Sequence, residues 1–319
     1  MGGRLADVAT RRLGFLWAVL RQLLWFVGLV VGVLALVQLL LWAAPGDPID
    51  LLGAEDLRAE LEAEWGLDRP LPVRIGQGIL GVLQGDLGSS LTVRPGASVW
   101  TLSAEAGTRS ARLLLPATLL SLLLSLALAW SDRRLRLVQA VSVMPVFLMA
   151  HVLVFSLNEV TFSLLQEGRI TRPAWFALPL NDTPMRSLLA TAILATGSGA
   201  LSSLTGELSA AMRHIRGSAW LEAARARGTP LLPHMLGNLL PPLLVSLASQ
   251  IAFLTGGLII VEKVLLLNGA GALLWEAALQ RDYPLAMGLA LLAAAVVCGA
   301  RLLANIARLL IDPRLRVPR

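Results

Sequence analysis

The sequence predicts an all-α, polytopic membrane protein with six transmembrane helices. Hydrophobic residues make up 56% of its 319 residues, and the mean hydropathy of +0.70 is far above that of soluble domains. The arginines gather at the ends of apolar stretches rather than inside them, as in chains that cross a bilayer several times. Six stretches reach about 18 residues or more, enough to span the hydrocarbon core. These stretches are residues 17–43, 113–130, 137–157, 187–204, 243–267 and 285–310.

The first stretch, residues 17–43, follows a short segment, residues 1–16, that carries Arg4, Arg11 and Arg12. An apolar run of about 27 residues is too long for the core of a signal peptide. We therefore expect this run to remain in the protein as a transmembrane anchor.

The distribution of charge predicts the orientation in the membrane. An even number of spans places both termini on the same side. Arginines outnumber acidic residues in both terminal segments and in residues 131–136 and 207–238, whereas acidic residues prevail in the alternate segments taken together. The positive-inside rule therefore predicts cytoplasmic termini, with a tail at residues 311–319 and a cytoplasmic loop at 207–238. Residues 44–112 are then extracytoplasmic.

The extracytoplasmic segment 44–112 is predicted to contain two amphipathic helices. Apolar residues recur at helical spacing over residues 57–65, before Gly66, and again over residues 75–83, before Gly85. We expect these helices to pack on the membrane spans. The alternatives are a position on the membrane surface or contact with a partner protein.

Composition and charge exclude several classes of function. The net charge of +6 would suit nucleic acid, but the arginines flank membrane spans, so we expect no nucleic-acid binding. The only lysine, Lys263, follows Glu262 rather than a glycine, so ATP would have to bind to another subunit. The lone Cys298 lies in an apolar run and is expected to pack as a small hydrophobic side chain. The histidines are scattered, and we expect no metal site, no cofactor and no catalytic residues.

Four residues are candidates for lining or gating a translocation path: His151, Ser198, Ser202 and Glu262. The two serines belong to a span rich in small and hydroxyl residues, which permits close helix packing and can equally line a polar path; packing is the simpler explanation. His151 is either a hydrogen-bonded core residue or a path residue. Glu262 and Lys263 are interpreted as a pair at the membrane boundary, with Lys263 extending to the surface.

A polar helix is predicted from Trp220 to Gly228, between the fourth and fifth spans. Ser218 can cap its first turn, Glu222 lies near its positive end, and Gly228 can close it in the left-handed conformation. Small residues at spacings of four allow another surface to approach its backbone. The helix is either a docking surface or a solvated connection between spans, and the charge pattern alone favours the solvated connection.

The polar helix belongs to a longer pattern. Glu222-Ala-Ala-x-Ala-x-Gly228 is followed by His234, Asn238 and Leu240-Pro241-Pro242, and this segment resembles the EAA loop of ABC importer permeases. Two further groups of residues resemble the first, or B-type, permease of dipeptide, oligopeptide and nickel importers. The earlier group is Gly46-Asp47-Pro48, Gly66-Leu67-Asp68-Arg69-Pro70-Leu71-Pro72-Val73-Arg74 and Gly85-Asp86-Leu87-Gly88-Ser89-Ser90. The later group is Gly256-Gly257, Val261-Glu262, Gly269-x-Gly271, Arg281-Asp282-Tyr283-Pro284 and Asp312-Pro313-Arg314-Leu315-Arg316.

The resemblance implies a MetI-like permease core over residues 113–310, in the inner (cytoplasmic) membrane of the cell. It also implies a coupling helix that fits a cleft on a cytoplasmic ATPase. The residues of that contact would be Trp220, Glu222, Ala223, Ala224, Arg225, Arg227 and Gly228. The implied partners are a second homologous permease, two cytoplasmic ATPase subunits and an extracytoplasmic solute-binding protein. The solute would be a peptide or a similar small molecule.

The sequence departs from the family pattern in three places. Residues 265–268 lack the usual aromatic residue and proline, the second span meets Arg133-Arg134 early and is therefore expected to be short, and the third and fourth spans keep little of the pattern. Because these spans help to line the path, two alternatives remain: transport of an unusual solute, and a loss of transport. The alternative functions are a non-transporting membrane scaffold that keeps the docking loop, and a secondary transporter or channel. A secondary transporter should contain a paired intramembrane carboxylate or an inverted repeat, and the sequence shows neither.

Overall fold

A computed structural model describes residues 2–43, 49, 58–65, 69–130, 144–171, 184–197 and 199–311. Within these ranges the chain is helical apart from turns, loops and one isolated bridge between Ser89 and Ser98, which confirms the all-α prediction. The helices are α1 (Gly2–Ala43), α3 (Arg58–Trp65), α4 (Leu71–Gln84), α5 (Val99–Trp130), α7 (Val146–Gln166), α8 (Pro184–Thr196), α9 (Ala200–Arg216), α10 (Ala219–Ala226), α11 (Leu231–Val264), α12 (Ala270–Leu279) and α13 (Tyr283–Ile311).

Up to six spans are long and apolar enough to cross a membrane within the described ranges. Five are single helices: Val19–Leu40, Val99–Ala129, Val146–Gln166, Met235–Val264 and Tyr283–Ile311. The sixth counts α8 and α9 together, although the two helices meet at an angle of 50°.

Four predicted spans have the wrong boundaries or shape. The fifth begins at Met235, before the predicted start at residue 243. α5 begins at Val99, well before residue 113, so the second span is long rather than short. α7 continues to Gln166, beyond the predicted end at residue 157. The fourth span, predicted as one stretch over 187–204, is divided between α8 and α9. Hydropathy locates apolar side chains, whereas a helix continues wherever its backbone hydrogen bonds can form, including through polar turns.

The break between α8 and α9 depends on two glycines. Gly199 has a positive φ of 80°, a conformation that glycine adopts without strain. An added Cβ at Gly197 would lie 2.9 Å from the carbonyl oxygen of Ile193 and 3.1 Å from Cγ2 of Val146 on α7. The two glycines at the bend therefore occupy positions where a side chain would be crowded, at Gly197, or strained, at Gly199. Ser198, between the two glycines, lies outside the described residues.

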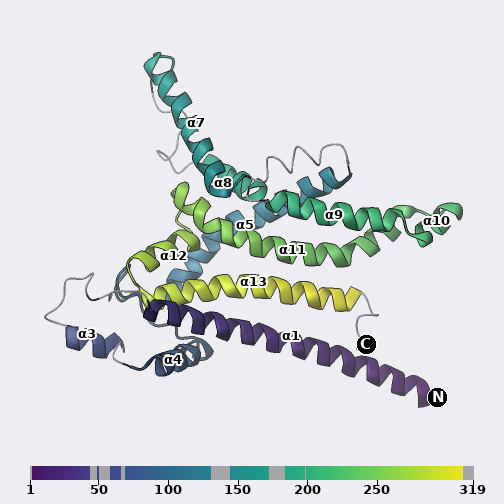
Figure 1. The fold of residues 1–319 in the computed structure, drawn as a ribbon, viewed down its shortest axis with the longest axis horizontal. Helices are drawn as coiled ribbons and strands as arrows, with labels where there is room; N and C mark the ends of the chain where they lie inside the picture. The colour runs from purple at the N-terminus through teal and green to yellow at the C-terminus, as the bar shows by residue number, and fades with distance from the viewer. Residues whose placement is uncertain are drawn as a thin grey trace.

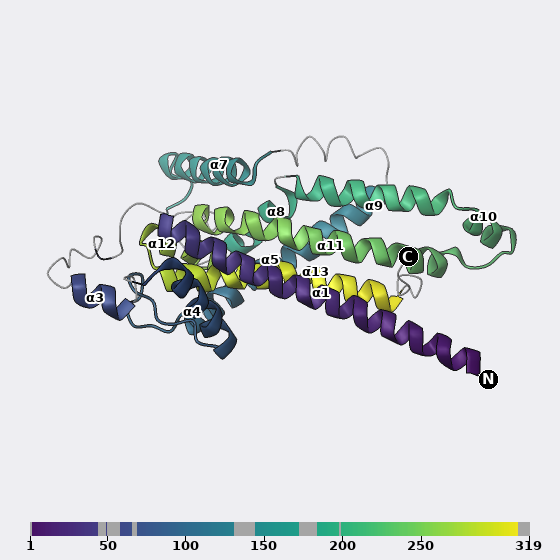
Figure 2. The same ribbon diagram turned by 60° about the horizontal axis from the view of Figure 1, so that its bottom comes forward.

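The two ends of the helical bundle carry different elements (Figures 1 and 2). α1, α13, α11 and α9 run side by side, with contacts between neighbouring helices along this series. α10 lies at one end, together with the N-terminus and the end of α13, and we call this the α10 end. α3, α4 and α12 lie at the opposite end, the α12 end. α10, the start of α1 and the end of α13 are thus on the same side of the bundle.

The second amphipathic helix of the extracytoplasmic segment, α4, packs on the membrane spans, as predicted. α4 contacts α1, and the guanidinium of Arg74 lies 5.8 Å from the centroid of the Tyr283 ring at the start of α13. Gly85 ends α4 with φ at 76°, so the predicted stop is also confirmed.

Three clusters of buried apolar side chains hold the bundle together. The first joins α5, α7, α8 and α11 through side chains such as Ile193 and Leu254. The second joins α5, α12 and α13 and contains Val99. The third joins α5, α9, α10 and α11 and contains Leu208 and Leu221. Within a bilayer such contacts stabilise the bundle through van der Waals packing, because the surrounding lipid is as apolar as the side chains themselves.

Large apolar side chains remain exposed on α1 and α7. Only 11% of the most apolar window of each helix is buried, and Trp25 and Phe155 are 68% and 71% exposed. An apolar surface of this extent suits contact with lipid chains or with the helices of another subunit.

Candidate functional site

α10 ends as the sequence predicts. Gly228 has φ at 67°, its N–H donates to the carbonyl of Arg225 at 3.0 Å, and the N–H of Thr229 donates to that of Ala224 at 3.2 Å. These two bonds form the Schellman motif, in which the residue just past the helix is left-handed. The predicted role of Gly228 in closing the helix is confirmed.

The start of α10 differs from the prediction. Ser218 occupies the position before the helix, but its hydroxyl donates backwards to the carbonyl of Ile215 at 2.6 Å instead of capping the first turn. Its carbonyl accepts the N–H of Leu221 at 3.0 Å. The serine therefore ties α10 to the end of α9 rather than capping it.

One face of α10 is fixed to the bundle and the other is exposed. Leu221 is fully buried in the cluster that joins α9 and α11, and Ala224 is 3% exposed. The remaining predicted contact residues are exposed: Trp220, Glu222, Ala223, Arg225, Arg227 and Gly228. The inclusion of Ala224 among the contact residues is corrected, since its side chain faces inward and can only help to position the helix.

Glu262 occupies a closed site at the end of α11. Its side chain is fully buried, and Oε1 accepts the hydroxyl of Ser110 at 2.5 Å. Oε2 accepts the N–H groups of Gly271 at 2.8 Å and Ala272 at 3.0 Å, at the start of α12. The interpretation of Glu262 and Lys263 as a pair at the membrane boundary is therefore wrong. Lys263 is exposed, whereas the carboxylate of Glu262 joins α5, α11 and α12.

Two glycines leave room for this carboxylate. A Cβ at Gly269 would lie 1.9 Å from Oε1 of Glu262, and a Cβ at Gly271 would lie 2.6 Å from Cα of Ile259. Ser110 adds a further bond by accepting the N–H of Ala270 at 2.7 Å. The Gly-x-Gly pattern of residues 269–271 is thus explained by the close approach of α12 to Glu262.

A second buried carboxylate, that of Asp282, organises the loop between α4 and α5. Its Oδ2 accepts the hydroxyl of Ser90 and the N–H groups of Leu91, Thr92 and Val93, the last three at 3.0–3.1 Å. Its Oδ1 accepts the N–H of Leu285 in the first turn of α13, at 3.2 Å. No role was predicted for Asp282 from the sequence. The sequence nevertheless contained a signal, because both partners belong to segments that resemble the B-type permeases. Ser90 ends the segment Gly85-Asp86-Leu87-Gly88-Ser89-Ser90, and Asp282 belongs to Arg281-Asp282-Tyr283-Pro284.

Asp282→Asn is expected to loosen the loop over residues 91–93 strongly. An amide has one accepting oxygen instead of two, so either the N–H groups of residues 91–93 or the N–H of Leu285 would face an NH₂ group, and a lost acceptor costs roughly 1–3 kcal/mol. Limited proteolysis of the purified protein in detergent would measure the change. The control is Asp86→Asn, because Asp86 is exposed and accepts the N–H of Gly88 at 2.9 Å within its own turn. Equal cleavage of the two variants would contradict the role of Asp282.

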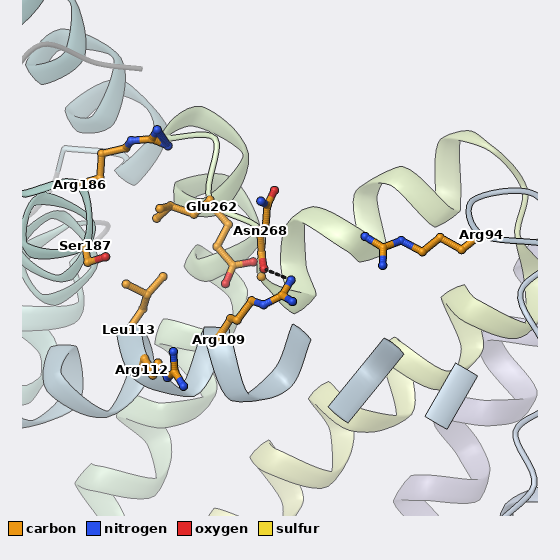
Figure 3. A pocket seen from close by; sticks show the side chains of 10 residues that line it. Arg94, Arg109, Arg112, Leu113, Arg186, Ser187, Glu262 and Asn268 are labelled. Atoms are coloured by element: carbon orange, nitrogen blue, oxygen red, sulfur yellow. Dashed lines mark hydrogen bonds between the residues drawn. The ribbon is translucent and has the colours of Figure 1, made fainter. Parts of the chain in front are cut away.

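A cavity of about 680 Å³ lies beside Glu262, between α5, α8 and the turn from α11 to α12. Figure 3 shows Arg109 and Arg112 on α5 on one side of Glu262, with Arg186 of α8 on the other. Arg94 lines the cavity from the loop before α5. Four arginine side chains and one buried carboxylate therefore line the same cavity.

The four predicted path residues do not come together. Glu262 lines the cavity, whereas His151 is exposed on α7 and Ser202 is half-buried on α9, its hydroxyl donating to the carbonyl of Gly199 at 3.3 Å. Ser198 lies outside the described residues. The arginines of the cavity were not predicted, because only Arg109 and Arg112 share a helical spacing and the other two come from separate segments.

Known proteins resemble this chain over most of its length. Residues 117–317 match the family described as binding-protein-dependent transport system inner membrane component. The oligopeptide transport system permease protein AppB of Bacillus subtilis is 26% identical over 313 residues, which cover 93% of this chain and 98% of AppB. The glutathione transport system permease protein GsiC of Salmonella typhimurium is 28% identical over 316 residues, with the same shares covered.

The match spans the apolar helices from α5 to α13, the EAA-like segment and α10. The apolar helices and the family place the chain in the inner membrane as a multi-pass protein. The resemblance of the EAA segment is thereby confirmed, and the chain belongs to the family of binding-protein-dependent transport system inner membrane components, the permeases of ABC importers.

Proposed function

We propose that this chain is one of two permease subunits in an ATP-driven importer of peptides or similar small solutes. Its partners would be a second homologous permease, two cytoplasmic ATPase subunits and an extracytoplasmic solute-binding protein. The chain itself would carry out no chemical reaction and hold no cofactor. The names of AppB and GsiC support a peptide solute, since glutathione is itself a short peptide.

The observation that carries this proposal is the form of α10. An exposed polar helix stands at one end of the bundle, anchored through Leu221 and closed by Gly228. Because α9 and α11 lead directly into and out of it, a push on α10 is transmitted to two long helices that pack on each other. This arrangement supports a coupling helix for a separate ATPase better than it supports a solvated connection.

The position of α10 also supports the orientation. Residues 207–238 and both terminal segments are rich in arginine, and α10 lies at the same end of the bundle as the start of α1 and the end of α13. We place this α10 end in the cytoplasm and the α12 end outside it, in line with the positive-inside rule. The exposed apolar faces of α1 and α7 would then contact lipid or the second permease.

The proposed path residues would have separate roles. The bonds of Glu262 to Ser110, Gly271 and Ala272 support a part in holding the outer turn rather than a contact with solute. His151 is an exposed ionisable side chain on a membrane span, a setting that favours a partner subunit or a water-filled path over lipid. Ser202 would help to hold the start of α9, where its hydroxyl donates to the carbonyl of Gly199.

Site-specific labelling and cross-linking would test the orientation and the docking surface together. In a Cys298→Ala background, Ser89→Cys should react with a membrane-impermeant maleimide in intact cells. Ala223→Cys should not react from outside, and in membranes of the complete complex it should cross-link to an ATPase subunit. Both target side chains are exposed, so access does not limit the reaction. Labelling of Ala223→Cys from outside would overturn the orientation, and the absence of any cross-link to an ATPase would overturn the docking role.

A further inference from the structure

We propose that a cavity between α1 and α13 binds an anionic phospholipid whose headgroup carries free hydroxyl groups, such as phosphatidylglycerol. The two helices run antiparallel and pack along each other (Figure 1). The cavity has a volume of about 500 Å³ and lies in the halves of both helices that are nearer the α10 end. The proposal goes beyond the proposed function, because it concerns the lipid around the subunit rather than the solute. Only the choice of membrane leaflet rests on the orientation proposed above.

Two arginines give the cavity its charge. Arg21 of α1 and Arg301 of α13 line it, both are exposed, and neither forms a hydrogen bond or ion pair with another described residue. No carboxylate is among the described residues that line the cavity. Charged groups on membrane spans are costly unless they are paired, and like charges in one site disfavour each other. The two guanidinium groups therefore favour an anion, and a phosphodiester accepts their N–H donors in parallel pairs.

The cavity also offers a partner for headgroup hydroxyls. Gln22 lines it, and the side-chain Oε1 of Gln22 is buried with no hydrogen-bond partner among the described residues. Because the residue as a whole is only half-buried, its amide can turn toward the cavity. A buried acceptor without a donor costs free energy, and a phosphodiester has no donor to supply. The glycerol of phosphatidylglycerol does supply hydroxyl donors, and Asn305 lines the cavity one turn beyond Arg301 as a further polar partner.

The depth of the cavity suits a lipid rather than a soluble anion. Arg21 lies near the start of the apolar stretch Val19–Leu40. Arg301 is about 27 Å along α13 from Tyr283, so it lies near one boundary of a hydrocarbon core about 30 Å thick. Trp25 and Leu29 line the cavity farther into the span and are 68% and 47% exposed, so they can contact acyl chains while the arginines bind the headgroup. Basic cavities between membrane helices on the cytoplasmic side are suited to anionic headgroups.

Native mass spectrometry of the complete complex in detergent would measure the binding. Phosphatidylglycerol, phosphatidylcholine and phosphatidylmethanol would be added separately at equal concentrations; the last is an anionic phosphodiester without headgroup hydroxyls. Phosphatidylglycerol should fill a saturable site with a preference of about tenfold or more over phosphatidylcholine, since each arginine near the headgroup favours the anionic lipid. Phosphatidylmethanol should bind at an intermediate level, because the oxygen of Gln22 then lacks a donor.

Arg21→Gln combined with Arg301→Gln should remove the preference for phosphatidylglycerol over phosphatidylcholine. The matched control is Arg169→Gln combined with Arg213→Gln, which removes the same charge from exposed positions outside the cavity and should keep the preference. Gln22→Met retains both arginines of the cavity. It should lower the binding of phosphatidylglycerol to the level of phosphatidylmethanol, which tests the site without altering its charge.

Four results would overturn the proposal. They are equal binding of phosphatidylglycerol and phosphatidylcholine, an equal loss in the control variant, binding of phosphatidylglycerol that Gln22→Met leaves unchanged, and displacement of the lipid by soluble glycerol phosphate. The last would mean that the ligand is a soluble phosphate ester. ATP-driven uptake, measured separately, decides the transport function without deciding this site.

Discussion

Gly269→Ala is expected to destabilise the α12 end severely and to prevent assembly with the second permease. The new methyl group would lie 1.9 Å from Oε1 of Glu262, so either the carboxylate or α12 must move. Movement breaks the bonds from Ser110, Gly271 and Ala272 to a buried carboxylate. Overpacking and the loss of these bonds together should cost roughly 3 kcal/mol or more. Thermal unfolding in detergent and co-purification of the second permease would measure the effect.

Gly256→Ala is the matched control on α11, because an added Cβ there meets no atom within 4 Å. A second comparison tests the cause. Combining Gly269→Ala with Glu262→Ala removes the atoms that would clash, so the double variant should be more stable than the sum of the single effects by about 1–3 kcal/mol. Strict additivity would show that Gly269 is needed for some reason other than the carboxylate.

Gly228→Val is expected to uncouple ATP hydrolysis from solute while leaving membrane insertion intact. The backbone at Gly228 is left-handed, and a residue with a side chain there costs about 1–2 kcal/mol even though an added Cβ would meet no atom within 4 Å. Valine would therefore shift the Schellman bonds to Ala224 and Arg225 and reorient the end of α10. Hydrolysis stimulated by solute and binding protein, in proteoliposomes, should fall at least tenfold.

Gly217→Val provides the comparison at the other end of α10. Gly217 has φ at −87°, and an added Cβ would be 3.5 Å from the carbonyl oxygen of Arg213, an ordinary contact. Backbone strain is therefore absent there, and coupling should stay near the level of the unchanged protein. If the two variants behave alike, the left-handed turn is not what matters for docking.

The sequence was a sufficient guide to local features. The stops at Gly85 and Gly228 could be predicted because a left-handed residue after a helix is a property of a few neighbouring residues. The number of spans followed from hydropathy alone, with the α8–α9 pair as one bent span. The polar face of α10 was recognised for the same reason, although the inward position of Ala224 depends on the packing of α10 against the bundle.

The features that could not be predicted depend on contacts between distant residues. Glu262 was assigned to the membrane boundary because its neighbour is a lysine, yet its partner Ser110 lies 152 residues earlier. Gly197 leaves room for Val146, which comes from another helix. The cavity arginines come from three separate segments, and nothing in any one of them indicates that they meet. Packing between distant residues therefore determines the candidate site, whereas the periodicity of apolar residues along the sequence was enough to predict the helices.

The bonds between Asp282 and the loop at Ser90 bear on how the chain is made. The two residues are 192 positions apart, so at roughly 5–20 residues per second about 10–40 s pass between their synthesis. During that interval the N–H groups of Leu91, Thr92 and Val93 lack the carboxylate that binds them in the complete chain. A polypeptide that ends before residue 282 never gains this carboxylate, so we expect proteases to cut its loop more readily than that of the complete chain.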